Sequence, residues 1–145
     1  MKRSRWALIA VVAALILGLA SPADGRVLTF DVVGDFDTFE MIESSPGHGP
    51  FYIGGTIFKE GTDEVIGTFH CWGTFFGDGA AVVSQEYDFF GRGKILVQGV
   101  EDEGRRAIVG GTREFKHISG QATGFDFSTF ADTGFFDGKF VYKRN

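Results

Sequence analysis

Apolar and polar residues alternate along the last segment of the chain. Between residues 135 and 143, Phe136, Phe140 and Tyr142 fall on one side of an extended backbone, and charged residues fall on the other. The same alternation runs through residues 27–33. A period of two is typical of β-strands with one buried face and one solvated face. Both ends of the domain are therefore predicted to be strands.

The rest of the chain shows the same character. After residue 23, no stretch repeats apolar residues at helical spacing over three turns, and glycine interrupts the chain at short intervals. This pattern predicts an all-β domain. The predicted strands lie at 27–33, 51–58, 64–75, 80–89, 93–101, 106–110, 120–127 and 135–143.

Glycines inside the predicted strands indicate how the strands assemble. Gly55, Gly67, Gly73 and Gly99 interrupt three different segments, and glycine tolerates the bulges and close backbone approach that sharply bent strands need. Closure also removes the exposed edges of an open sheet. We therefore expect an eight-stranded antiparallel closed barrel; the alternative is a two-layer sandwich.

The first 23 residues are typical of a signal peptide. Lys2, Arg3 and Arg5 precede an apolar run at 6–20 that ends in small residues. The run is shorter than the roughly 20 residues of a membrane-spanning helix. We expect cleavage after Ala20 or Ala23, a domain at 24–145, a secreted or periplasmic location, and no membrane association afterwards.

Charge and cysteine content exclude some functions. The formal charge of −5 becomes −8 after cleavage, with 11 Lys and Arg against 19 Asp and Glu. No basic stripe interrupts this acidity, so we expect no nucleic-acid partner. The single cysteine, Cys71, cannot form an internal disulfide. The three histidines lie far apart in the sequence, without the spacing of a zinc site, so no metal is expected.

Three segments resemble a known family. They are Phe-Tyr-Ile-Gly-Gly-Thr-Ile-Phe at 51–58, the Phe-Gly-Arg-Gly run into Gln-Gly at 90–99, and Ala-Ile-Val-Gly-Gly-Thr-Arg-Glu-Phe at 107–115. In this order they resemble the allene oxide cyclase and dirigent barrels. The family turn motif falls on Gly110, Gly111, Thr112 and Glu114. Arg113 replaces the turn glycine, so it either adopts a positive φ or the turn has another shape.

The resemblance implies a function as well as a fold. Barrels of this family, often homotrimeric, hold a hydrophobic small molecule, a lipid or a phenolic compound, in an apolar cavity. They steer its cyclisation or its stereoselective coupling by shape, without a metal or an organic cofactor. Two alternatives remain open: a non-catalytic carrier with the same cavity, and an exported structural module whose barrel is filled by its own side chains.

Inward-facing residues on the predicted strands are the candidates for the cavity wall. Cys71 and His70 alternate and cannot face the same way, and the same holds for Glu86 and Tyr87. An inward Tyr87 would orient a ligand through its hydroxyl, whereas an inward Glu86 would have a raised pKa suited to acid–base chemistry. The candidate cavity residues are Cys71, Tyr87, Glu86, Phe30, Phe136, Phe140 and Tyr142.

Overall fold

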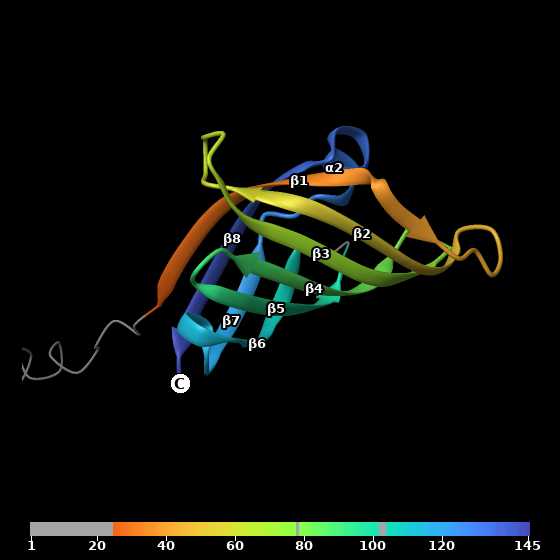
Figure 1. Cartoon of the computed structure of the whole chain (residues 1–145). Helices are drawn as coiled ribbons and strands as arrows, with labels where there is room; N and C mark the ends of the chain where they lie inside the picture. The colour runs from red at the N-terminus through yellow and green to blue at the C-terminus, as the bar shows by residue number, and fades with distance from the viewer. Residues whose placement is uncertain (1–24, 78, 102–103) are drawn as a thin grey trace, which may run out of the picture.

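The protein is a closed antiparallel β-barrel of eight strands (Figure 1). The computed structural model describes residues 25–77, 79–101 and 104–145, so the predicted signal peptide lies outside the described residues. The barrel prediction is confirmed and the sandwich is excluded. The strands are β1 (Arg26–Met41), β2 (His48–Phe58), β3 (Val65–Phe76), β4 (Ala81–Phe89), β5 (Gly93–Val100), β6 (Arg105–Gly111), β7 (Ile118–Thr123) and β8 (Phe135–Arg144).

Each strand pairs with the next along the chain, and β1 pairs with β8 to close the barrel. The closing register brings Val32 opposite Phe136 and Leu28 opposite Phe140. Strand β1 is longer than predicted because it continues past an irregularity between Asp35 and Glu40, where the pairing with β2 shifts register. This extension carries β1 beyond the predicted segment 27–33 to one end of the barrel.

A short helix, α2 (Phe127–Thr133), covers that end and was not predicted. Its N-terminus is capped by Asp126, whose carboxylate accepts a hydrogen bond from the backbone N–H of Thr129 at 3.1 Å. Its C-terminus ends at Gly134 in the left-handed conformation, with φ of 71°. The Gly134 carbonyl accepts a hydrogen bond from the N–H of Gly34 on β1. These contacts fix α2 against β1, as Figure 1 shows.

The interior of the barrel is largely filled by aromatic rings. Phe30 is 1% exposed and contacts the rings of Tyr87, Phe89 and Phe140, with centroid distances of 5.4, 5.4 and 4.8 Å. The alternation predicted for β8 is confirmed, because Phe136, Phe140 and Tyr142 are all buried. The core therefore forms from the inward faces of the strands.

The family turn motif does not form a tight turn between two strands. Strand β6 ends at Gly111, and a 3-10 helix, η1 (Arg113–Phe115), precedes β7. Arg113 adopts a φ of 50°, one of the two outcomes expected for it. Phe115 is fully buried, whereas the carboxylate of Glu114 lies outside and pairs with Arg92 at 2.8 Å. Hydrogen bonds from Arg92 lower the pKa of Glu114.

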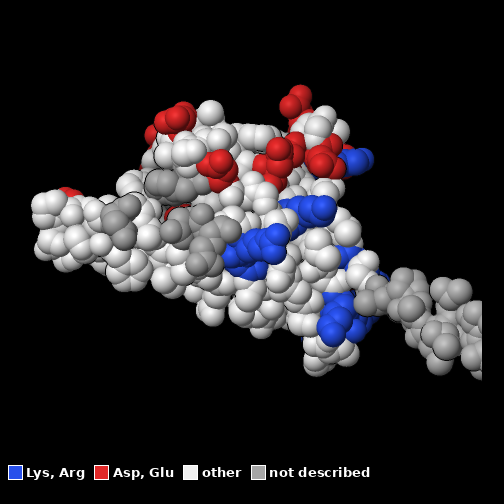
Figure 2. All heavy atoms as spheres, turned by 180° about the vertical axis from the view of Figure 1, so that it is seen from behind, with Lys and Arg blue, Asp and Glu red and all other residues white. Residues whose placement is uncertain are grey.

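Acidic and basic side chains are separated on one face of the molecule. In Figure 2, most Asp and Glu side chains lie along the upper edge, and most Lys and Arg side chains lie below them, from the middle to the lower right. No helix of the part of the chain that the structure describes is long and apolar enough to cross a membrane.

Candidate functional site

An apolar pocket lies at the end of the barrel beside α2. Its volume is about 220 Å³. Phe36 and Phe39, from the extended part of β1, are 49% and 43% exposed, so the pocket rim is accessible to solvent. The lining residues are Phe36, Phe39, Phe51, Ile53, Phe75, Glu101, Phe130 and Ala131. A single carboxylate among these apolar side chains makes the pocket chemically asymmetric.

Helix α2 supplies one wall of the pocket through Phe130 and Ala131. The ring of Phe130 packs directly on the backbone of β1 at Gly34. A Cβ atom at Gly34 would lie 2.6 Å from Cζ of Phe130, so any larger residue would push the ring and the helix outward. The absence of a side chain at this position therefore shapes the pocket.

Glu101 is the ionisable group of the pocket. It follows directly after β5, it is 6% exposed, and its backbone N–H donates to the Ala81 carbonyl at 2.8 Å. Burial raises the pKa of the Glu101 carboxyl to about 7, although the positive charge of Arg106 opposes the rise. A carboxyl group with this pKa can give or take a proton near neutral pH.

A row of neutral polar groups lies deeper in the barrel. The Tyr87 hydroxyl donates to Oε1 of Gln85 at 3.1 Å, and Nε2 of Gln85 donates to Sγ of Cys71 at 3.7 Å. Burial raises the pKa of Cys71 to about 12 and also raises that of Tyr87. Both side chains therefore stay protonated at neutral pH, and Cys71 has no thiolate character.

Six of the seven predicted cavity residues point inward, but none of the seven lines the pocket. The inward residues belong to the filled part of the barrel, where aromatic side chains from opposite strands meet. They are Cys71, Tyr87, Phe30, Phe136, Phe140 and Tyr142. The sequence identified the inward face of β1 and β8 correctly, but it did not show where along the barrel space for a ligand remains.

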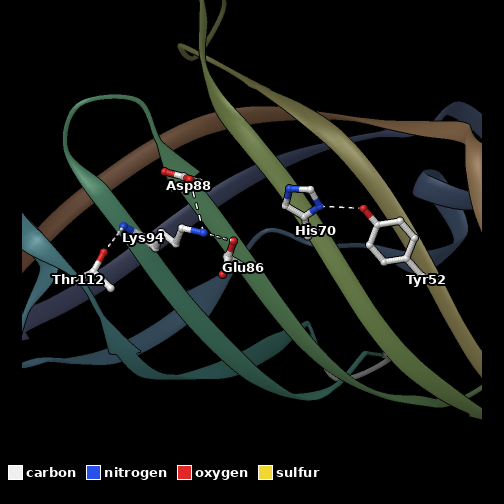
Figure 3. A network of polar contacts seen from close by, with 6 residues as sticks. All are labelled: Tyr52, His70, Glu86, Asp88, Lys94 and Thr112. Atoms are coloured by element: carbon white, nitrogen blue, oxygen red, sulfur yellow. Dashed lines mark hydrogen bonds and ion pairs between the residues drawn. The ribbon is translucent and has the colours of Figure 1, made fainter.

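Glu86 lies on the outer face, and its prediction as a cavity residue is wrong. Its carboxylate pairs with Nζ of Lys94 at 2.6 Å, beside Asp88 on the same face of β4 (Figure 3). His70 also lies outside, where it is hydrogen-bonded to the Tyr52 hydroxyl at 2.8 Å (Figure 3). Alternation decides both placements, because their neighbours Tyr87 and Cys71 occupy the interior.

Two buried charged residues, Glu101 and Arg106, were missed at the sequence level. The signal was present, because Glu101 shares its strand face with Val97, and Arg106 shares its face with Ile108. All four are buried in the structure. Charged residues at interior positions are rare unless they carry out a function or have partners. Among the described residues, no cluster of three or more His, Cys, Asp or Glu side chains could hold a metal ion.

The raised pKa of Glu101 predicts how stability depends on pH. The folded protein retains the proton up to about pH 7, whereas the unfolded chain releases it near 4.5. The stabilising contribution of Glu101 to the free energy of unfolding is therefore complete below pH 4.5 and is lost as the pH rises through 7. The amide side chain of the Glu101→Gln variant has no proton to lose. The difference in unfolding free energy, variant minus wild type, should rise by about 3 kcal/mol between pH 4 and pH 8.

Urea unfolding of both proteins at a series of pH values measures this difference. A variant made at an exposed carboxylate, Glu64→Gln, serves as the control and should show no comparable rise. A constant difference between Glu101→Gln and wild type across the range would show that Glu101 titrates normally.

No protein-family model matches the sequence, and no curated protein matches it either. Solved structures do match. A pyocyanin demethylase has a TM-score of 0.64 and 13% identity, covering 81% of this chain and 100% of its own. A pterocarpan synthase dirigent protein has a TM-score of 0.62 and 14% identity, covering 84% and 87%. A Diels–Alderase from Streptomyces koyangensis has a TM-score of 0.55 and 13% identity, covering 100% and 82%.

These similarities confirm the predicted resemblance at the level of the fold. The chain is a barrel of the allene oxide cyclase and dirigent type, and its relation to the solved structures is structural and distant. At such low identity, the structural similarity does not assign a role to any residue of this chain. The chemistry has to be argued from the pocket of this chain.

Proposed function

We propose that this protein binds an apolar small molecule in the pocket beside α2 and steers its cyclisation or coupling, with Glu101 as the proton donor or acceptor. The observation that carries the proposal is the burial of Glu101 in the wall of an otherwise apolar pocket. Structural neighbours with this fold include proteins named as a demethylase, a dirigent protein and a Diels–Alderase. The same fold thus supports reactions of small molecules in other proteins.

The size of the pocket is suited to a molecule of one or two rings. Its volume of about 220 Å³ exceeds the roughly 150 Å³ cavity that is known to accept benzene. Aromatic walls from Phe51, Phe75 and Phe130 restrict the conformations of a bound flexible substrate. Holding reacting atoms in a productive arrangement contributes up to about 7–11 kcal/mol to lowering a barrier.

Glu101 adds chemistry to this positioning. With a pKa of about 7, protonated and ionised forms are both present near neutral pH. The protonated form can donate to an oxygen that develops negative charge, and the ionised form can remove an acidic proton from the substrate. The apolar surroundings exclude water and strengthen either interaction. A carrier without catalysis would need the pocket but would not need the proton.

Blocking the pocket should abolish binding of an apolar probe. Ala131 is exposed and lines the pocket from α2, so the indole of Ala131→Trp adds bulk at the rim without disturbing the core. We expect this variant to bind 1-naphthamide at least tenfold more weakly than wild type, as measured by isothermal titration calorimetry. Loss of the contacts of one aromatic ring corresponds to at least about 1.4 kcal/mol.

Thr129→Trp is the matched control, because Thr129 is exposed on the same helix and does not line the pocket. Its affinity for 1-naphthamide should equal that of the wild type. If 1-naphthamide does not bind to wild type, or binds equally to both tryptophan variants, the pocket is not the binding site.

A further inference from the structure

Arg106 is a buried cation, and two of its three guanidinium nitrogens have no hydrogen-bond partner among the described residues. It is 3% exposed, on the inward face of β6. Among the residues that the structure describes, neither Nε nor Nη1 of Arg106 has a hydrogen-bond partner. Leaving a buried donor unsatisfied costs about 1–3 kcal/mol, and more for a charged group. No acceptor for these two groups is found among the described residues, so a ligand that supplies one would offset this cost.

The surroundings of Arg106 position its guanidinium without a hydrogen bond from the described residues to Nε or Nη1. The guanidinium carbon lies over the ring of Phe125, 4.5 Å from the ring centroid. Gly99 on the neighbouring strand β5 leaves room for the stem, since a Cβ atom there would lie 2.8 Å from Cγ of Arg106. Stacking on an aromatic face stabilises the cation but leaves the donors at its edge available.

Arg106 belongs to the same end of the barrel as the pocket. Phe125, which stacks on Arg106, contacts the ring of Phe130 at 5.4 Å, and Phe130 lines the pocket. The charge of Arg106 also acts on Glu101, the polar residue of the pocket lining. Yet none of the ion pairs found among the described residues joins Arg106 to Glu101. The positive charge is therefore near the pocket, without an ion-pair contact to the Glu101 carboxylate.

We propose that the end of the barrel that holds the pocket and Arg106 binds an apolar molecule of aromatic size that carries a carboxylate. Arg106 binds this carboxylate. The inference rests on the proposed function, which places the apolar part of the ligand in the pocket beside α2. A carboxylate matches the single charge and the planar donors of a guanidinium, and such pairs are among the strongest hydrogen bonds in proteins. The aromatic lining accommodates the rest of the molecule.

The ionisable groups around Arg106 make the proposed binding depend on pH. Glu101 faces it from the end of β5, Cys71 from β3 and Tyr87 from β4. Cys71 and Tyr87 remain neutral at neutral pH because burial raises their pKa values. Glu101 is the group that changes, and its ionised form competes with a bound carboxylate for the charge of Arg106. Carboxylate binding should therefore weaken as the pH rises through 7.

Two ligands of nearly equal shape test the proposal. 1-Naphthoate is an anion at pH 6, whereas 1-naphthamide is neutral, and calorimetry on the full domain measures both affinities. Charged hydrogen bonds of about 1.5–3 kcal/mol predict that wild type prefers naphthoate by roughly ten- to a hundredfold. In Arg106→Gln this preference should disappear, while the affinity for naphthamide is retained.

Arg105→Gln is the matched control, because Arg105 is adjacent in the chain and exposed on the outer face. It should keep the preference for naphthoate. Should Arg106→Gln fail to fold, Arg106→Lys keeps the positive charge and should retain a reduced preference. In Glu101→Gln, naphthoate affinity should no longer decline as the pH rises through 7. A purely structural role of Arg106 would not make naphthoate binding depend on the ionisation of Glu101.

The outcomes separate the two proposals. Equal affinities of wild type for the two ligands, or a preference for naphthoate that survives in Arg106→Gln, would overturn the carboxylate site alone. Absence of binding by both ligands would overturn the proposed pocket function and the carboxylate site together.

Discussion

Glu101→Gln is expected to slow the reaction of the natural substrate by about 10²–10⁴-fold, the usual contribution of a positioned acid or base. Glutamine has almost the same size and shape as protonated glutamate, but it cannot transfer a proton. The pocket and its aromatic walls stay intact, so binding should change little. Because the proposed role of Glu101 depends on its pKa of about 7, the wild-type rate should also vary with pH around this value.

The measurement uses a small-molecule extract of the source cells, incubated with each protein and followed by liquid chromatography and mass spectrometry. Cyclisation leaves the mass unchanged and shifts the retention time, so substrate and product are recognised as isomers. Coupling instead joins two molecules and gives a product of roughly twice the mass. Rates of disappearance for wild type and Glu101→Gln then give the fold-change.

Glu86→Gln is the matched control, because the Glu86 carboxylate lies on the outer face and pairs with Lys94. Its rate should equal that of wild type. If wild type converts no compound, the protein acts as a carrier, and if Glu101→Gln reacts as fast as wild type, Glu101 does not transfer a proton.

Phe30→Ala is expected to lower the free energy of unfolding by about 3–5 kcal/mol, the range found when buried phenylalanines are truncated. The ring of Phe30 is 1% exposed and contacts three other aromatic rings at the centre of the barrel. Its edge also lies against Gly138 on β8, where a Cβ atom would be 2.2 Å from the ring. Because Gly138 has no side chain, it cannot fill the cavity that the substitution leaves.

Urea or guanidinium unfolding at constant pH measures the effect. Phe90→Ala removes the same ring from a position that is 57% exposed, so it should cost far less than Phe30→Ala. Comparable losses in the two variants would mean that the centre of the barrel is loosely packed. Such a result would contradict the filled interior on which the location of the pocket depends.

The barrel combines a packed aromatic centre, formed without a disulfide, with an apolar pocket at one end. Aromatic rings from β1, β4 and β8 pack at the middle of the barrel, where Phe30, Tyr87 and Phe140 meet. Space remains at the end of the barrel where β1 extends past its irregular register and α2 supplies one wall. The extended end of β1 and α2 therefore decide the location and the size of the pocket.

The sequence also allowed a good part of the interior to be predicted. Alternation placed Phe30 inside, and it allowed only one inward residue in each of the pairs His70–Cys71 and Glu86–Tyr87. The structure has Phe30, Cys71 and Tyr87 buried. The same reasoning applied to 93–101 would have placed Glu101 inside, because it lies an even number of residues from Val97. Helix α2 could not be recognised, since seven residues are too few for a helical repeat to emerge.

By itself, the sequence determined the all-β class, the closed eight-stranded barrel and the inward face of the first and last strands, because a period of two is a local property that survives any tertiary arrangement. Only the tertiary structure decided which inward residues meet in a filled core and which border the pocket. That outcome depends on strand register, on closure between β1 and β8, and on the docking of α2. The proximity of Glu101 and Arg106 likewise depends on the pairing of β5 with β6, which no local pattern records.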